Sequence, residues 1–245
     1  MIEEFIHAYS SKPELLWISA IAFTIGYLEY IYSSRLLLRE RLAPYPVWMH
    51  TFYFAHDFTG AIVFFNLAQQ YDFFWVFVAA GIALLVWNGF EIFNLYMAVK
   101  VERQVIWGKF YDRPVKASEA LLRVIGQVLL MFGVVNLFRV FMDDQLMFKW
   151  FAFTNILIAV APGYLWAERK SRNGASVGLA LVIFIGTVNT FLPPGWGMWT
   201  TALAYFDQPW FYLTGVVVSA YALHNLVMLW RLPPKPVHDG RKPIW

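Results

Sequence analysis

Residues 73–99 read FFWVFVAAGIALLVWNGFEIFNLYMAV, a long apolar run in which Glu91 is the one charged side chain. A helix that crosses a lipid bilayer needs about 20 mostly apolar residues, and this run is long enough. Its strongly polar side chains, Asn88, Glu91 and Asn94, are spaced at i, i+3 and i+6, so they share one face of a helix. The run therefore predicts a membrane-spanning helix with one polar face.

The composition of the whole chain agrees with a location in lipid. Of the 245 residues, 60% are apolar and 20% aromatic, but only 14% are charged. Soluble domains are about half apolar and about a quarter charged. The net charge of +3 is too small to indicate a nucleic-acid partner. The absence of Cys excludes disulfides, zinc–thiolate sites and a cysteine nucleophile. We expect no cofactor.

Charge distribution predicts how the spans are oriented. Most of the 19 Lys and Arg residues fall in alternate connections and after the last window, which indicates the cytoplasmic side. The sequence thus predicts an all-α, integral membrane seven-helix bundle at 1–231, with the N-terminus outside. A Pro-rich, basic cytoplasmic tail follows at 232–245. The membrane would be a bacterial inner membrane or a eukaryotic endomembrane. The seven windows are 14–33, 47–68, 73–99, 119–141, 147–167, 175–193 and 209–231.

A short motif occurs twice along the chain. Gly-Tyr-Leu followed by Ser-Arg is found at 26–28 and 34–35, and again with the same spacing at 163–165 and 171–172. One interpretation is a 3+1+3 parallel repeat, in which three helices and a linking helix precede three more. The other is chance agreement in a chain of biased composition.

Polar side chains within spans are costly, and they indicate a functional site or a structural pair. At ~1.5 Å per residue from the cytoplasmic ends, one layer of them lies about 10–16 Å deep. A carboxyl in a low-dielectric environment can stay protonated at neutral pH and act as an acid, so Asp57 and Glu91 are the candidate catalytic residues. The candidate substrate-binding residues are His56, Tyr53, Trp87, Asn88, Gln127, Tyr221, His224 and Glu29.

Other kinds of site are disfavoured. We expect no metal site, because the side chains of the adjacent His56 and Asp57 should diverge by about 100° on a helix. The last span has no Lys for a retinal Schiff base. His50, near a membrane interface, is expected to be an anchor. Arg123 is expected either to reach the interface or to neutralise Glu91.

Four groups of residues between 26 and 59 resemble the membrane-integral terpene cyclases, a family of small seven-helix enzymes. The resemblance implies acid-initiated cyclisation of an isoprenoid, with Asp57 in the position of the family's acid and His56 in place of its Trp. The family has a second acid in its last helix, where this chain has Tyr221 and His224; Glu91 is our own candidate for that role. The four groups are Gly26-Tyr27-Leu28-Glu29-Tyr30, Arg39-Glu40-Arg41, Tyr45 and Phe54-Ala55-His56-Asp57.

Three classes of function remain open on this evidence. The first is an enzyme for a lipophilic, isoprenoid-like substrate, in which aromatic rings stabilise cations. The second is a small-solute transporter with a site near the midplane. The third is a non-catalytic membrane subunit or lipid-binding scaffold, in which the aromatic residues serve helix packing. The expected partners are the lipid bilayer and, for the enzyme, a lipophilic small molecule. The sequence does not predict an oligomeric state.

Overall fold

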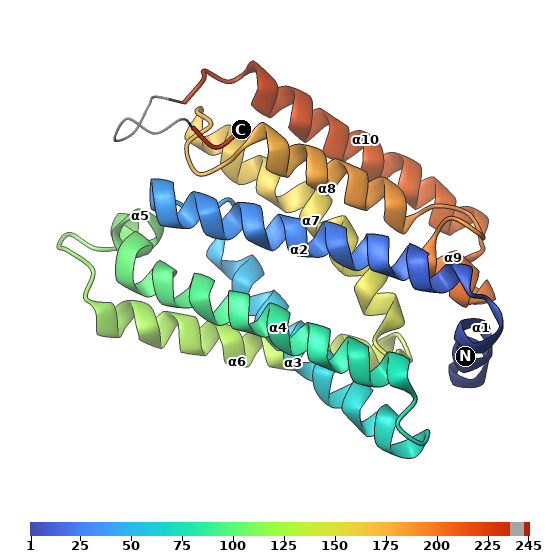
Figure 1. Cartoon of the computed structure of the whole chain (residues 1–245). Coiled ribbons are helices and arrows are strands. Elements are labelled where there is room, and N and C mark those ends of the chain that lie inside the picture. The colour runs from blue at the N-terminus through green and yellow to red at the C-terminus, as the bar shows by residue number, and fades with distance from the viewer. Residues whose placement is uncertain (236–242) are drawn as a thin grey trace. The chain divides into compact units, whose positions relative to one another are not determined.

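A computed structural model describes residues 1–235 and 243–245 of the chain (Figure 1). Helices account for 79% of it, and the described residues form no strand. The predicted all-α class is confirmed. Part of the predicted tail at 232–245 lies outside the described residues, including the basic pair at 241–242.

Within the described residues, a helix forms in each of the predicted windows, and short helices lie in several connections. In chain order the elements are α1 (Ile2–Ser11), α2 (Glu14–Glu40), α3 (Val47–Gln70), α4 (Trp75–Met97), η1 (Ala98–Glu102), α5 (Arg103–Trp107), η2 (Gly108–Phe110), α6 (Ala117–Phe141), α7 (Phe148–Arg169), α8 (Val177–Thr190), α9 (Met198–Ala202), η3 (Ala204–Phe206) and α10 (Pro209–Arg231).

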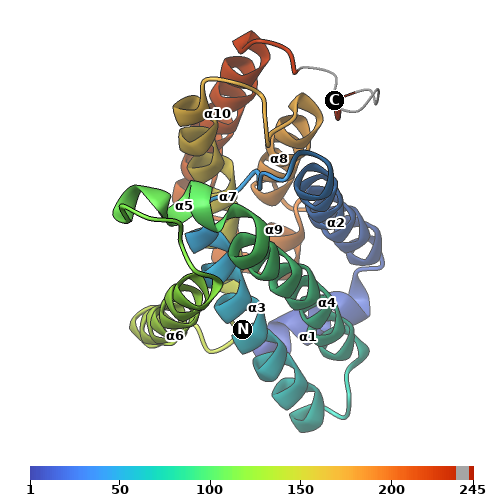
Figure 2. The same ribbon diagram turned by 90° about the vertical axis from the view of Figure 1, so that its left-hand side faces the viewer.

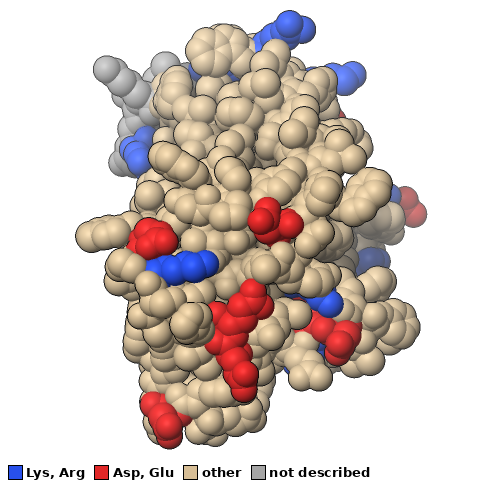
Figure 3. Space-filling view, turned by 90° about the vertical axis from the view of Figure 1, so that its right-hand side faces the viewer, with Lys and Arg blue, Asp and Glu red and all other residues tan. Residues whose placement is uncertain are grey.

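Five of these helical segments are long and apolar enough to cross a membrane: α2, α4 with its continuation to Phe110, α6, α7 and α10. They fit a multi-pass membrane protein. On the face seen in Figure 3, most side chains are uncharged and several acidic side chains gather near the middle. Two of the predicted spans are not among the five. His50, His56 and Asp57 lower the hydropathy of α3, and α8 has only 14 residues.

The ends of α8 explain why it is shorter than its predicted window. Ser176 caps the start, because its Oγ accepts a hydrogen bond from the backbone N–H of Leu179 at 3.0 Å. The helix ends at Thr190, shortly before Pro193 and Pro194, which cannot continue a helix. At the helical rise, α8 is ~21 Å long, less than the ~30 Å hydrocarbon core of a bilayer.

The chain divides into two compact units. Unit 2 contains residues 37–150, and in it α3 packs along both α4 and α6. Helices α3 and α4 form an antiparallel hairpin and lie side by side in both ribbon views (Figures 1 and 2). The hairpin turn is closed by a hydrogen bond of 2.7 Å from the N–H of Phe73 to the oxygen of Ala68. Asp72 and Phe73 both have positive φ there.

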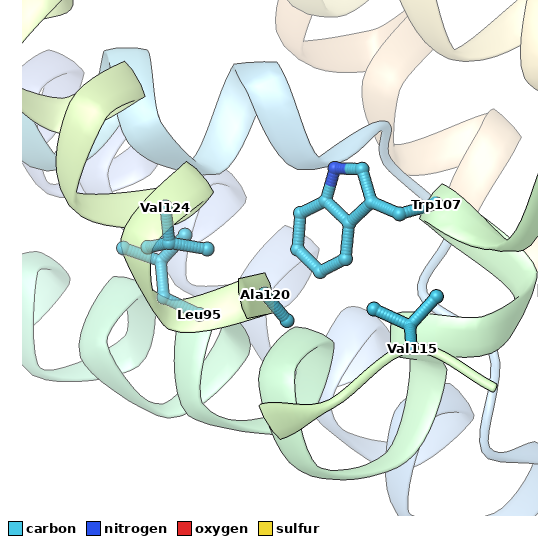
Figure 4. Close-up of a cluster of buried hydrophobic side chains, with 5 residues drawn as sticks. All are labelled: Leu95, Trp107, Val115, Ala120 and Val124. Carbon is cyan, nitrogen blue, oxygen red and sulfur yellow. The ribbon is translucent and has the colours of Figure 1, made fainter. Parts of the chain in front are cut away.

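The connection from α4 to α6 in unit 2 is held by a small apolar cluster (Figure 4). Trp107 and Val115 of the connection are 4% and 3% exposed, and they pack with Leu95 of α4 and with Ala120 and Val124 of α6. Because this cluster fixes the backbone of the connection, the polar side chains around it are also held in position.

Unit 1 contains residues 1–36 and 151–245. In it α8 packs along α10, and α1 packs against α9. Helices α7 and α10 approach closely at Gly163, where an added Cβ would overlap the carboxamide of Asn225. The Nδ2 of Asn225 donates a hydrogen bond of 2.9 Å to the oxygen of Ala159 on α7. Glycine is therefore required at position 163 for this crossing.

Candidate functional site

Two pairs of a carboxyl and an imidazole are buried in unit 2, within the α3–α4 hairpin. His50 on α3 contacts Glu91 on α4, with 2.6 Å between Nδ1 and Oε2, and both side chains are at most 3% exposed. His56 contacts its neighbour Asp57, with 2.8 Å between Nδ1 and Oδ1. Each pair can hold one proton on either partner, so each is a candidate proton donor or acceptor.

The antiparallel hairpin places the two pairs near each other. If the contact of His50 with Glu91 sets the register, Asn88 lies opposite Tyr53, between the levels of the two acids. Along α3, Asp57 is ~10 Å from His50 at the helical rise. The two carboxyls are thus candidates for a single site within unit 2.

Several buried polar atoms on this hairpin have no hydrogen-bond partner within the part of the chain that the structure describes. They are Nε2 of His50, Oδ2 of Asp57, Oδ1 of Asn88, and both amide atoms of Asn94. Asn88 and Asn94 are only 4% and 1% exposed. Leaving a buried donor or acceptor without a partner costs about 1–3 kcal/mol, so a fold keeps such atoms where something else binds them. The hairpin therefore offers both donors and acceptors to a polar group.

Aromatic rings surround both imidazoles. Phe52 stacks on His56 with 5.8 Å between ring centroids, and Trp150 approaches the same ring edge-on at 6.1 Å. Tyr45 meets His50 edge-on at 5.8 Å. Aromatic faces attract cations by about 0.5–2 kcal/mol, more when water is excluded. Phe52, whose ring is stacked on His56, is the ring that can stabilise a ligand cation beside that imidazole.

Two sequence-based expectations about this region are wrong, and one of the two alternatives for Arg123 is ruled out. His50 is not an interfacial anchor, because it is 2% exposed and bonded to Glu91. The side chains of His56 and Asp57 do not diverge, because rotation about their side-chain bonds brings Nδ1 and Oδ1 together. Arg123 is not the partner of Glu91. It lies on the exposed side of α6, where its Nε donates to the Tyr111 hydroxyl at 3.2 Å.

The structure divides the remaining predicted site residues between the two units. In unit 2, Tyr53, Trp87 and Gln127 are partly buried, and the Oε1 of Gln127 has no partner within the described ranges. In unit 1, Glu29 lies beside Gly186 of α8, and an added Cβ at Gly186 would be 3.3 Å from the Glu29 Oε1.

Two more predicted site residues of unit 1, Tyr221 and His224, lie on an exposed side of α10. The hydroxyl of Tyr221 is 3.3 Å from that of Tyr164 on α7. Neither residue is buried in the way that the two acids of unit 2 are.

Sequence reasoning missed two residues near the site and one buried carboxyl elsewhere in unit 2. Phe52 lies one helical turn before His56, so the i, i+4 spacing was a usable signal. Trp150 is distant in sequence and offered none. Glu102, at the end of the π-helix η1, is 3% exposed, and its Oε1 accepts a hydrogen bond of 2.7 Å from the N–H of Ala43. A π-helix often marks a functional segment, but no residue pattern here predicts it.

Neither a metal site nor a relative adds to this description. Among the residues at 1–235 and 243–245, no three His, Asp or Glu side chains are grouped so that they could hold a metal ion. No protein-family model, no curated protein and no solved structure matches the chain.

Proposed function

We propose that this protein is a membrane-embedded enzyme that cyclises or isomerises a lipophilic, isoprenoid-like substrate, with Asp57 and Glu91 as its acid–base residues. The observation that carries the proposal is the pair of buried carboxyl–imidazole contacts in the α3–α4 hairpin. The Phe52 ring stacked on His56 and the burial of both pairs add to it, because a carbocation is stabilised by an aromatic face and by exclusion of water.

The chemistry needs only a proton that is given and returned. A protonated carboxyl donates its proton to an alkene carbon or an epoxide oxygen. The new C–H bond uses the electrons of the C=C π bond, or the new O–H bond is accompanied by cleavage of an epoxide C–O bond, and either leaves a carbocation on the substrate. The cation moves as carbon–carbon bonds form. A neighbouring carboxylate or imidazole then removes a proton from the carbon next to the cation, which closes a C=C bond. The product is an isomer, so no electrons are exchanged.

Isosteric replacement of the acids tests this proposal. Membranes containing the protein would be incubated with plain and epoxidised polyprenyl substrates, and the products would be separated by mass. Asp57→Asn and Glu91→Gln should each lower turnover by about 10²-fold or more, the usual contribution of a general acid or base. Glu168→Gln, an exposed carboxyl on α7, is the matched control and should keep full turnover. Equal product profiles for all four proteins would refute the assignment.

A small-solute transporter is a second candidate, favoured by one feature of unit 1. Pro162 lies inside α7 and removes a backbone hydrogen bond there, and the amide of Asn225 bonds the oxygen of Ala159 in the same turn. Interrupted helices are common at the binding sites of transporters. Proteoliposomes loaded with buffer would be tested for uptake of labelled sugars and amino acids. Accumulation of an unchanged solute would favour transport over catalysis.

We further infer that the chain crosses the membrane seven times, with the N-terminus outside and the C-terminus in the cytoplasm. The helices at all seven predicted windows and the basic alternate connections support this topology. The five strongly apolar segments alone would put Asp112 and Gln208 on the same side, whereas seven crossings put them on opposite sides. The proposed 3+1+3 repeat would make α6 the linking helix.

The absence of Cys makes this topology directly testable. Asp112→Cys and Gln208→Cys place single thiols at exposed positions in two connections. With seven crossings, a membrane-impermeant maleimide added to intact cells labels the thiol at 208, and labels the one at 112 only after permeabilisation. Labelling of both thiols from the same side would reject seven crossings.

A further inference from the structure

The α4–α6 connection in unit 2 is rich in cations, but the protein itself binds only some of them. Arg113 forms two hydrogen bonds with Glu119, of 3.0 and 2.5 Å. Arg103 donates to the backbone oxygen of Val115 at 2.9 Å. These two guanidinium groups therefore hold the connection in shape and are already occupied.

Lys109 and Arg123 are placed differently, because both lie over one aromatic ring. The Nζ of Lys109 is 5.4 Å from the centroid of the Phe110 ring, and the Cζ of Arg123 is 5.6 Å from the same centroid. Arg123 also lies 5.3 Å from the Tyr111 ring. Neither cation has a carboxylate partner among the residues described. Both cations thus lie within 6 Å of the centre of one ring, and the only side-chain hydrogen bond of Arg123 within the described residues goes to the Tyr111 hydroxyl.

Buried side chains hold in place the backbone that carries Phe110 and Tyr111. The buried cluster of Trp107 and Val115 with Leu95, Ala120 and Val124 anchors the backbone on both sides of Phe110 and Tyr111 (Figure 4). Phe110 itself is 61% exposed. The backbone beneath this exposed ring is anchored, and two cations lie against the ring. Little side-chain entropy is therefore lost when an anion binds to these cations.

The adjacent surface indicates where that anion must lie. Arg123 is in the second turn of α6, next to Leu122, which is 71% exposed, and just before Ile125 and Leu129, which are 47% and 66% exposed. These side chains form part of an apolar helix that is long enough to cross a membrane. An anion that reaches Arg123 is therefore at the boundary between water and lipid, where aromatic residues are also enriched.

We propose that Lys109 and Arg123, supported on Phe110 and Tyr111, bind the phosphate of an anionic phospholipid head group. Charge complementarity favours it: an anionic lipid surface attracts basic residues that lie next to a membrane helix. Guanidinium and ammonium groups form short, charge-assisted hydrogen bonds with phosphate oxygens. A lipid is the occupant that also covers the exposed apolar residues of α6.

Lipid binding to the purified full-length chain tests the proposal. The protein would be stripped of lipid in neutral detergent and titrated separately with phosphatidylglycerol and phosphatidylcholine, with the bound lipid counted by native mass spectrometry. The wild type should prefer phosphatidylglycerol. Lys109→Gln and Arg123→Gln should each weaken its binding about fivefold, the equivalent of ~1 kcal/mol for each basic residue near an anionic surface. Binding of phosphatidylcholine should not change.

A control variant, a check of folding and a competition experiment complete the test. Arg35→Gln removes an exposed cation of α2 and should leave the preference for phosphatidylglycerol intact. Circular dichroism should show unchanged helix content for every variant. An excess of inorganic phosphate should displace little of the lipid. Equal affinity of the wild type for both lipids, an equal loss in Arg35→Gln, or full displacement by inorganic phosphate would overturn the proposal.

Discussion

In unit 2 the helices α3 and α4 meet through ionisable side chains, whereas in unit 1 the helices α7 and α10 meet through a glycine and an amide. His50 and Glu91 join the first pair of helices by a contact of 2.6 Å. Gly163 and Asn225 join the second pair. Both contacts join polar groups away from water, but only the first is made by ionisable side chains.

The same contrast extends to other glycines. In unit 1, added Cβ atoms at Gly186 and Gly215 would come closer than real contacts allow to Ile25 and Phe191. In unit 2, the glycines of α6, Gly126 and Gly133, have nothing within 4 Å of an added Cβ. At Gly81 of α4 the overlap would be smaller, because an added Cβ would lie 3.0 Å from the Phe65 ring. At these helix crossings, side chains of unit 1 pack directly against glycines, whereas the glycines of α6 in unit 2 leave open space.

Removing one partner of the buried pair in unit 2 should have the largest effect. Glu91→Leu leaves His50 buried without its carboxyl, and breaking a buried pair in this way destabilises proteins by about 3–5 kcal/mol. Adding His50→Phe should restore most of the loss, because apolar side chains of similar volume replace such pairs at little cost. Thermal unfolding of the single and double variants in detergent measures both. If the double variant does not regain stability, the pair stabilises the protein by more than the mutual hydrogen bond of His50 and Glu91.

Substitution at the glycine contact of unit 1 should come next. Gly163→Ala adds a methyl group that overlaps the carboxamide of Asn225, and overpacking of this kind costs about 1–3 kcal/mol. Asn225→Ala in the same chain should relieve the overlap but lose the hydrogen bond to Ala159. The loss in the double variant should thus be smaller than the sum of the two single losses. Strict additivity, measured by thermal unfolding, would show that the two side chains do not meet.

The helices were predictable because they follow from local pattern. The run 73–99 predicted α4 to within two residues at its start, since Asp72 and Tyr71 interrupt the apolar run there. The end of α8 was not predicted well. Apolar residues continue past Thr190 in the sequence, and only the pair Pro193 and Pro194 signals that the helix has stopped.

The sequence predicted the features of the candidate site that a single helix determines, but not the contacts between helices. The i, i+3, i+6 spacing of Asn88, Glu91 and Asn94 indicated a shared face, and the structure buries all three. The partner of Glu91 was out of reach, because the register of α3 against α4 comes from packing along the whole hairpin. His50 was misread as an anchor since it lies only one turn from the start of α3.

Gly126→Ala sharpens the comparison of glycines. Nothing lies within 4 Å of the added Cβ, so the substitution removes backbone freedom from the unfolded chain without creating a clash. Such changes stabilise helical positions by about 0.4–1 kcal/mol. Thermal unfolding should therefore show a small rise in stability, opposite in sign to Gly163→Ala. A fall would mean that the glycines of α6 are also packing contacts.

The smallest effect is expected at Asp144, a buried carboxyl of unit 2 that lacks an imidazole. Its side chain lies in the connection between α6 and α7, and its Oδ2 accepts a hydrogen bond of 2.8 Å from the N–H of Trp150. Burial raises the pKa of Asp144 above its ordinary value of 3.8, although the Trp150 N–H opposes the shift. A carboxyl with a raised pKa favours the folded state below its unfolded pKa, and this contribution is lost as the pH rises through the folded pKa.

Asp144→Asn should therefore gain stability relative to the wild type as the pH increases from 3 to 7, because the amide oxygen can still accept from Trp150 while no charge is buried. The difference in unfolding temperature between the two proteins, followed across that range, is the measurement. A constant difference would mean that the backbone N–H groups of Phe148, Lys149 and Trp150, together with the Lys149 charge, offset the burial of the Asp144 carboxylate fully. In that case the imidazoles beside Asp57 and Glu91 would not be needed to keep carboxyls inside unit 2, and their presence would indicate a role in proton transfer.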